Sequence, residues 1–509
     1  MTEGLHLNGR TLRLRDLVDY EARRPAVALA ADARARMQGS VDALARIVAS
    51  GKPSYGVNTG FGAFANQRIP REEIRTLQYN LVRSHACGVG EPLPAHLVRR
   101  IMLLKANSLA VGVSGIRAEV VETLLDLLEA DVLPRIPSKG SVAASGDLAP
   151  LAHLTLALIG EGEAAHRGAL VEGPAVLAAA GRSPVELQAK EGLALLNGTQ
   201  VTAALAIEGL LRGHALVESA LAIGALCVDG LAGSYSPFDP RIHAARGLDG
   251  QIRVAEQFRS LLTDSAIKRS HADCDRVQDP YALRCMPQVF GAVWDTLAHA
   301  ARVLECECNS VSDNPLVFGE EVISGGNFHA EPLGFVADFM SIAVAELGSI
   351  SERRIDLLER KVNPSLNMFL TTRPGLESGF MIAHVTSAAL ASENKTLAHP
   401  ASVDTIPTSA GQEDHVSMAA WAALKLLRIC DNVELILAIE ALAAARAIDA
   451  QAPLTTTPQL APVHACIRAR VPYDPSDHRL DREIETIAGM IRTGELGALL
   501  PERARTAVI

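Results

Sequence analysis

Aromatic residues are scarce in this sequence of 509 residues: Phe, Trp and Tyr together make up 4%, and only six residues are tyrosines. Hydrophobic residues nevertheless make up 48%, and Ala and Leu supply much of that apolar mass. Because Ala and Leu favour helices, while aromatic and β-branched residues favour strands, the composition predicts a helical core rather than a β-sandwich. The length corresponds to about three domain-sized units, unless one large helical body contains them all.

The sequence also lacks an excess of basic residues and the high cysteine content of a disulfide-stabilised protein. Lys and Arg number 48 against 58 Asp and Glu, so the net charge of −10 provides no basic field for nucleic acid. Eight cysteines are ordinary usage and not a disulfide scaffold. Residues 1–6 lack the features of a secretory signal, and charge-free stretches such as 148–160 are too short to cross a bilayer. We expect a soluble, cytoplasmic protein without a nucleic-acid or membrane partner.

Long stretches rich in Ala and Leu dominate the sequence after residue 198. Their charges recur every few residues, which is typical of the amphipathic helices of a bundle. These stretches cover residues 199–229, 282–311, 331–361, 378–398 and 413–450. We therefore expect an all-α fold, with an N-terminal mixed but mainly helical domain over residues 1–198. A central long-helix bundle with a C-terminal helical segment is expected over residues 199–509.

The first third of the chain is more broken. Residues 5–12 predict a small hairpin that turns at Asn8-Gly9, and a second hairpin is expected at residues 316–324. A glycine-rich segment, residues 55–62, is too irregular for a helix or a strand. Helices are expected on either side of it, over residues 27–49, 71–84, 94–110 and 116–130.

Residues 140–150, G-S-V-A-A-S-G-D-L-A-P, permit an unusual backbone reaction. The nitrogen of Gly146, with no Cβ beside it, can attack the carbonyl of Ala144, and loss of water from Ser145 then leaves an exocyclic methylidene. The product is a 4-methylideneimidazol-5-one (MIO), a strong electrophile. The plain alternative is a loop that leads into a helix capped by Asp147 or Ser145.

Several motifs resemble those of the MIO-dependent aromatic amino acid ammonia-lyases. The signature around the MIO, the mobile tyrosine loop and the asparagine motif of that family match residues 144–153, 55–62 and 191–199. The resemblance runs from about residue 50 to residue 450, with the motifs in the same order. It implies an MIO formed from Ala144, Ser145 and Gly146, no metal or external cofactor, and a homotetramer with active sites shared between chains.

The likeness is nearest to the branch of that family that acts on histidine. His85, residues 277–285 and residues 412–418 look like the motifs of this branch. His85 and Glu413 can form hydrogen bonds with both ring nitrogens of an imidazole, whereas a phenyl ring would leave each unpaired at about 1–3 kcal/mol. The resemblance thus implies elimination of ammonia from L-histidine to give trans-urocanate. A tyrosine or phenylalanine ammonia-lyase, or a 2,3-aminomutase, is the alternative on the same scaffold.

The resemblance also gives roles to further residues. Alone, each has an ordinary interpretation, because a loop Arg is usually solvated, a loop amide usually forms a turn, and a lone Phe usually packs in a core. Proton transfer is assigned to Tyr55 and Tyr281, and binding of the MIO oxygen and the substrate to Asn197, Gln278 and Gln412. Arg284 is assigned to binding of the substrate carboxylate, and Phe328 to packing beside the MIO. Catalysis is also assigned to Glu413 and to the MIO-forming residues.

Known metal motifs do not match this sequence. His329-Ala330-Glu331 imitates part of a zinc-deaminase signature, but the P-C-x-x-C half is missing, and Cys306 and Cys308 stand alone. No metal site is therefore predicted. The sequence departs from the resembling family at Ala143, Asn367, Glu377 and Gly411, which concerns substrate choice and rate rather than reaction class. A catalytically dead helical assembly protein is the alternative from another class.

Overall fold

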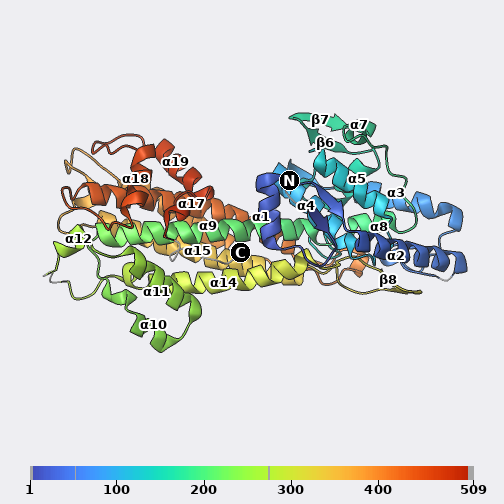
Figure 1. Cartoon of the computed structure of the whole chain (residues 1–509), viewed down its shortest axis with the longest axis horizontal. Coiled ribbons are helices and arrows are strands. Elements are labelled where there is room, and N and C mark those ends of the chain that lie inside the picture. The colour runs from blue at the N-terminus through green and yellow to red at the C-terminus, as the bar shows by residue number, and fades with distance from the viewer. Residues whose placement is uncertain (1–3, 52, 273–275, 502–509) are drawn as a thin grey trace.

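Five long helices run side by side through the computed structural model, which describes residues 4–51, 53–272 and 276–501 (Figure 1). They are α9 (Gln200–Gly230), α14 (Met286–Cys308), α15 (Glu331–Glu359), α16 (Met381–Leu397) and α17 (Ala419–Asp449). Each matches one of the stretches predicted from the Ala/Leu pattern, with α9 extending one residue beyond its stretch, so the predicted helical bundle is confirmed. The fold is mainly helical, and its strands are only two to four residues long.

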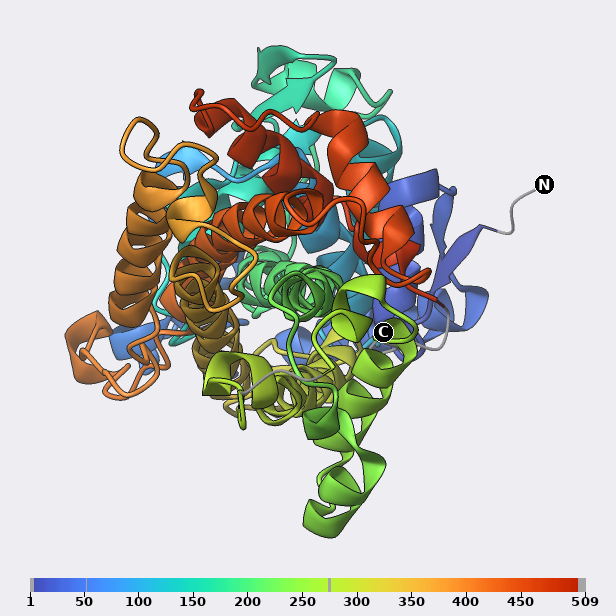
Figure 2. The same cartoon turned by 90° about the vertical axis from the view of Figure 1, so that its left-hand side faces the viewer.

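Helix α9 lies in the middle of the bundle, as the end-on view in Figure 2 shows, and contacts α14, α15 and α17. Small residues allow this close approach: a Cβ at Gly209 would lie 2.2 Å from the Leu426 side chain. Within the described residues, α9 and α15 are apolar and long enough to cross a membrane by composition alone. However, 72% and 67% of their most apolar windows are buried inside the molecule, as expected for core helices.

Shorter helices form a head at one end of the bundle (Figure 1). They are α1 (Leu14–Arg23), α2 (Ala31–Ser50), α3 (Ile74–His85), α4 (Ala95–Ala110), α5 (Ala118–Glu129), α6 (Leu148–Leu158), α7 (Pro174–Ala178) and α8 (Glu191–Leu196). Short sheets join them through β3 (Val89–Pro92), β4 (Leu133–Pro134), β5 (Pro137–Lys139), β6 (Glu163–His166) and β7 (Ala169–Glu172). The head and the bundle share one continuous hydrophobic core.

The predicted hairpin at residues 5–12 is wrong. Strand β1 (Leu5–Leu7) instead pairs in parallel with β2 (Val27–Leu29), which also replaces the first residues of the helix expected over 27–49. The Asn8 carboxamide accepts hydrogen bonds from the backbone of Arg10 and Thr11, while Gly9 donates to Asn107. The Asn-Gly turn therefore directs the chain toward α1 rather than back along β1. The second expected hairpin is confirmed as β8 (Leu316–Phe318) with β9 (Glu321–Ile323).

The opposite end of the bundle, here called the tail end, carries the remaining helices. They are α10 (Pro240–Arg246), α11 (Asp249–Leu261), α12 (Ala266–Arg269), α13 (Tyr281–Arg284), α18 (Ala461–Arg470) and α19 (Asp481–Arg492). Helix α14 begins at the tail end and finishes at the head, where Cys308 accepts a hydrogen bond from Asn107 in α4. The bundle thus keeps the two ends apart by the length of its helices.

Candidate active site

Residues 142–147 form a bent segment that is held on both sides by hydrogen bonds. On one side, the Asp147 amide donates to the Gly198 carbonyl at 2.7 Å. On the other side, the Ser417 hydroxyl donates to the Ala143 carbonyl at 3.0 Å, and the Met418 amide to that of Val142 at 3.1 Å. The segment that was singled out for its backbone chemistry is therefore fixed between two parts of the chain that are distant in sequence.

Asn197 holds the carbonyl group of Ser145. The side-chain amide of Asn197 donates to the backbone oxygen of Ser145 at 2.7 Å, and the backbone carbonyl of Asn197 accepts a hydrogen bond from the Lys105 ammonium at 2.7 Å. Lys105 is buried, and this burial lowers its pKa to about 7 although the nearby Asp313 favours the charged form. Lys105 therefore fixes the backbone of Asn197, whose side chain holds the Ser145 carbonyl.

Asp147 lies at the N-cap position of α6, as one reading of the sequence predicted, but its carboxylate does not cap that helix. It accepts hydrogen bonds from the Thr202 amide at 2.7 Å and from the Thr202 and Ser141 hydroxyls at 2.8 Å. Burial raises the pKa of Asp147, and these hydrogen bonds oppose that rise. Asp147 thus ties residues 142–147 to the start of α9, a role that no local sequence signal indicates.

Glu413 lies against Ser145, and His85 lies near enough to Glu413 for their charges to interact. The Ser145 hydroxyl donates to Glu413 at 2.6 Å, and Thr408 and Ser409 donate to its other oxygen at 2.6 and 2.8 Å. Burial raises the pKa of Glu413, but these hydrogen bonds and the nearby His85 outweigh it, so the pKa lies below its ordinary value. Burial lowers the pKa of His85, against the effect of Glu413. At neutral pH, Ser145 thus contacts a carboxylate that has a neutral imidazole nearby.

Other candidates lie on neighbouring loops of the head. Residues 62–64, in the same loop as Tyr55, contact residues 409–411, just before Glu413. The Tyr55 hydroxyl accepts a hydrogen bond from Gly62 at 3.2 Å, within its own loop. Gln412 is exposed, and half-buried Phe328 precedes His329, whose ring stacks on His415. The Tyr55 loop and Gln412 thus lie in segments next to Glu413, while Phe328 lies beside the stacked His329.

Three predicted site residues do not reach Ser145 within one chain. Tyr281 and Arg284 form α13 at the tail end, and Gln278 directly precedes them. The 23 residues of α14 follow, and at about 1.5 Å per residue they span about 34 Å. At the far end of α14, Glu307 accepts a hydrogen bond from Thr199, close to Asn197. The predicted constellation is therefore split between the two ends of the molecule.

The family is decided by comparison with known proteins. A family model described as aromatic amino acid lyase matches residues 12–469. The chain belongs to this family. A histidine ammonia-lyase of Burkholderia orbicola (strain MC0-3) is 55% identical to it over 459 residues, which cover 90% of each protein.

Two solved structures of aromatic amino acid lyase relatives have the same fold. A histidine ammonia-lyase from Trypanosoma cruzi has 39% sequence identity and a TM-score of 0.90, with 99% of this chain and 97% of that chain covered. A tyrosine aminomutase from Streptomyces globisporus has 35% identity and a TM-score of 0.92, with 98% of both chains covered. The family, with its carbon–nitrogen lyase chemistry, is thus established, and the substrate of this chain is a separate question.

Members of this family depend on MIO, and residues 143–146 fit that group. Gly146 has a φ of +68°, and a Cβ there would lie 2.4 Å from the Gly198 oxygen, so only glycine fits this position. Cyclisation would retain the Ser145 carbonyl as the ring carbonyl, which Asn197 already holds. Ala143, one of the departures expected from the family pattern, has a φ of +53°; this left-handed conformation costs about 1–2 kcal/mol.

The other departures from the family pattern have local structural roles. Gly411 has a φ of +84°, a conformation that suits Gly and Asn alike. Glu377 accepts hydrogen bonds from Thr372 and Arg373, which lower its pKa to about 2. Asn367 donates to the Thr371 carbonyl at 3.0 Å. Glu377 and Asn367 thus stabilise the loop between α15 and α16, away from the reactive segment.

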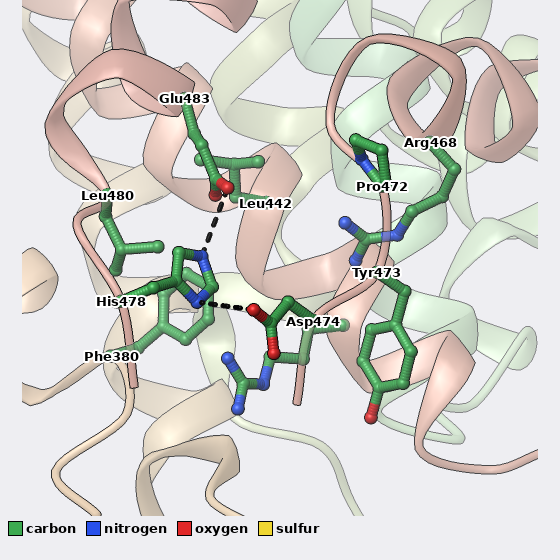
Figure 3. Close-up of a pocket in the computed structure, with 10 residues that line it drawn as sticks. Phe380, Leu442, Arg468, Pro472, Tyr473, Asp474, His478, Leu480 and Glu483 are labelled. Atoms are coloured by element: carbon green, nitrogen blue, oxygen red, sulfur yellow. Dashed lines mark ion pairs between the residues drawn. The ribbon is translucent and has the colours of Figure 1, made fainter. Parts of the chain in front are cut away.

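A pocket at the tail end has no part in this site (Figure 3). His478 points between Glu483 at 3.1 Å and Asp474 at 3.8 Å, and these ion pairs hold residues 472–480 against the C-terminal helices. The pocket lining contains none of the predicted site residues of this lyase. Its side chains fix the C-terminal helices to α17 instead.

Proposed function

We propose that the chain is a histidine ammonia-lyase that converts L-histidine to trans-urocanate and ammonia. The pair His85 and Glu413 beside Ser145 carries this proposal, because two polar groups at the reactive segment suit an imidazole and disfavour a phenyl ring. An MIO formed from residues 144–146 would supply the electrophile that makes loss of the amine possible. The high identity to proteins named histidine ammonia-lyase supports the same substrate.

The charge states of the two groups fit an imidazole ligand. Glu413, with its pKa below the ordinary value, is ionised at neutral pH and accepts a hydrogen bond from a ring N–H. His85, with its pKa lowered by burial, is neutral and can donate a hydrogen bond to the other ring nitrogen. Together they hold the ring in one orientation relative to Ser145. A phenyl ring has neither a donor nor an acceptor and would leave both groups unpaired.

The remaining roles belong to loop residues. Tyr55 is our candidate for removal of the β-proton, and Tyr281 for proton transfer at the amine. Arg284 binds the substrate carboxylate through its planar guanidinium group. Asn197 and Gln278 hold the MIO oxygen and the substrate, Gln412 contributes to substrate binding, and Phe328 packs beside the prosthetic group.

We further propose a homotetramer in the cytoplasm, with each active site built from more than one chain. Two observations support shared sites: Tyr281 and Arg284 lie about 34 Å from the head along α14, and α15 exposes an apolar stripe. Phe335, Phe339 and Ile342 are 45–47% exposed, and the two Phe rings stack at 6.0 Å. An exposed stripe at helical spacing marks a protein interface. A second copy that packs along this stripe would bring its tail end to the Ser145 head.

Complementation between inactive variants tests the sharing of sites. Ser145→Ala and Arg284→Ala chains, each made separately, should have little activity. Co-assembled in equal amounts, they should recover activity at roughly one quarter of the sites, because random assembly pairs an intact head with an intact tail that often. Separately assembled tetramers that are mixed after assembly are the control. Absence of recovery in verified mixed assemblies would show that each chain builds its site alone.

A substrate panel tests the reaction. The purified protein is supplied with L-histidine, L-tyrosine or L-phenylalanine, and the conjugated acid product is followed by its ultraviolet absorbance. We expect turnover of histidine to urocanate and little product from the other two. Turnover of tyrosine without turnover of histidine would contradict the proposal and favour an activity like that of the tyrosine aminomutase. Chiral analysis of β-amino acid products separates mutase from lyase activity.

A further inference from the structure

Three potential metal ligands gather where the start of α15 meets the loop that carries Glu413. His329 ends the loop before α15, Glu331 is the first residue of that helix, and His415 lies two residues after Glu413. Their ligand atoms all lie within 4.8 Å of one another. His329 and Glu331 are partly buried and His415 is exposed, so the cluster is open to solvent on one side. The proximity joins segments that are more than 80 residues apart in sequence.

The hydrogen bonding of His329 leaves its Nδ1 atom, itself an acceptor, facing a carboxylate oxygen of Glu331. Its Nε2 lies 3.3 Å from the His415 carbonyl oxygen, which can only accept, so Nε2 carries the proton. The Nδ1 atom then faces a Glu331 carboxylate oxygen at 3.9 Å. That oxygen is buried and has no hydrogen-bond partner among the described residues. Two acceptors that face each other in this way are satisfied by a group placed between them, and a metal cation is one such group.

We propose that His329, Glu331 and His415 bind a divalent transition-metal ion of the Zn²⁺ class. Two imidazoles and one carboxylate form a known zinc ligand set that leaves a position open to solvent or a small ligand. The bond from His329 to a backbone carbonyl is the contact that usually fixes a metal-binding imidazole.

Ligand bonds of about 2.0–2.2 Å require the donor atoms to close to roughly 3.0–3.5 Å from one another. The rings of His329 and His415 are stacked at 5.6 Å, and exposed His415 can turn its ring toward the ion because little surrounds it. Bound there, the ion would fasten the loop of Glu413 to α15. The linear His329-Ala330-Glu331 motif does not reveal this site, because the third ligand comes from a distant loop.

Binding of the metal alone is the test. Tag-free assembled protein is treated with a chelator, dialysed and titrated with Zn²⁺ by calorimetry, and then with Co²⁺, whose visible spectrum reports its ligands. We expect one ion per chain, with affinity at least tenfold weaker in His415→Ala and Glu331→Gln than in the wild type. His299→Ala, an exposed histidine on α14, serves as the matched control and should bind as the wild type does.

Two outcomes would overturn the metal site. Absence of saturable binding to the wild type would show that these three residues do not form a metal site. Equal binding by the wild type, His415→Ala and Glu331→Gln would place the ion elsewhere. Circular dichroism and light scattering establish that the variants fold and assemble, and the exposed position of His415 keeps that variant informative if Glu331→Gln does not fold.

Discussion

The head and the tail end of this molecule differ in how completely they hold their candidate catalytic groups. At the head, Ser145, Asn197 and Glu413 form hydrogen bonds with one another and with buried neighbours. At the tail end, Tyr281 is 70% exposed, and Arg284 stacks on it with the guanidinium 4.6 Å from the ring centre. The Arg284 Nε is buried without a hydrogen-bond partner among the described residues. The candidate catalytic groups of the head are thus held in place within one chain. At the tail end, the Tyr281 ring is exposed and the Arg284 Nε can still donate a hydrogen bond.

The largest expected effect comes from breaking the head at Ser145. Ser145→Ala cannot form the methylidene, so turnover of histidine should fall by on the order of 10³-fold or more, equivalent to about 4 kcal/mol of barrier. The fold should remain assembled, because the hydrogen bonds of the Ser145 backbone to Asn197 are kept. Product absorbance measures turnover, and intact mass should show the loss of two waters around residues 144–146 in the wild type only. Wild-type turnover in the variant would refute the MIO mechanism.

The tail end is tested by Arg284→Ala. Loss of a charge-assisted hydrogen bond to the substrate carboxylate should lower kcat/KM for histidine by about 10- to 100-fold. Arg302→Ala is the matched control, since among the described residues its side chain forms hydrogen bonds only with Ala298 and His299 on its own helix. Steady-state kinetics with both variants gives the comparison. Equal kcat/KM in Arg284→Ala and wild type would remove the tail end from the active site.

A smaller effect is expected from neutralising Glu413. Glu413→Gln keeps the size of the side chain but removes the charge that accepts a hydrogen bond from the imidazole, so kcat/KM for histidine should fall by about tenfold. The control is Asp414→Asn, a neutralised carboxylate at the next, exposed position. Kinetics on histidine and tyrosine should show a larger loss for histidine. A loss equal for both amino acids would mean that Glu413 does not select the ring.

The smallest effect concerns stability against pH. The pKa of Glu413 is lowered in the folded protein, from the ordinary 4.5, so its ionised form stabilises the fold above that pH. This stabilisation is lost as the pH falls through the folded-state pKa. The melting temperature of the wild type should therefore exceed that of Glu413→Gln at pH 7, and the gap should close as the pH falls below the folded-state pKa of Glu413. A gap that widens on acidification would contradict the assignment. Solvent screening keeps the effect small, because Glu413 is only partly buried.

Long helices and contiguous motifs could be predicted from the sequence because their signals are local. The Ala/Leu periodicity gave α9 and α15 nearly to their ends, and residues 144–146 were recognised from their chemistry. Contacts across the fold have no such signal. The pairing of β1 with β2 depends on where α2 packs, and the contacts of Asp147 with Thr202 depend on the start of α9. His415 beside His329 likewise follows only from the folded loops.

The proposed functional residues show the same difference between local sequence signals and contacts that depend on the fold. Asn197 and Glu413 were selected by motif, and the fold brings both to Ser145, with His85 near Glu413. Gln278, Tyr281 and Arg284 were selected in the same way, but the sequence contains no measure of distance along α14. Only the structure reveals that they lie at the other end of the bundle. The roles assigned to these residues stay predictions until variants are measured.

The length of α14 has a consequence for inheritance. If each chain gives its head to one active site and its tail end to another, a single chain altered at both ends damages two sites. In a cell that makes normal and doubly altered chains in equal amounts, random assembly would leave roughly one quarter of the sites intact rather than one half. Such an allele would behave as partly dominant, whereas an allele altered only at Ser145 would reduce activity in simple proportion to its dose.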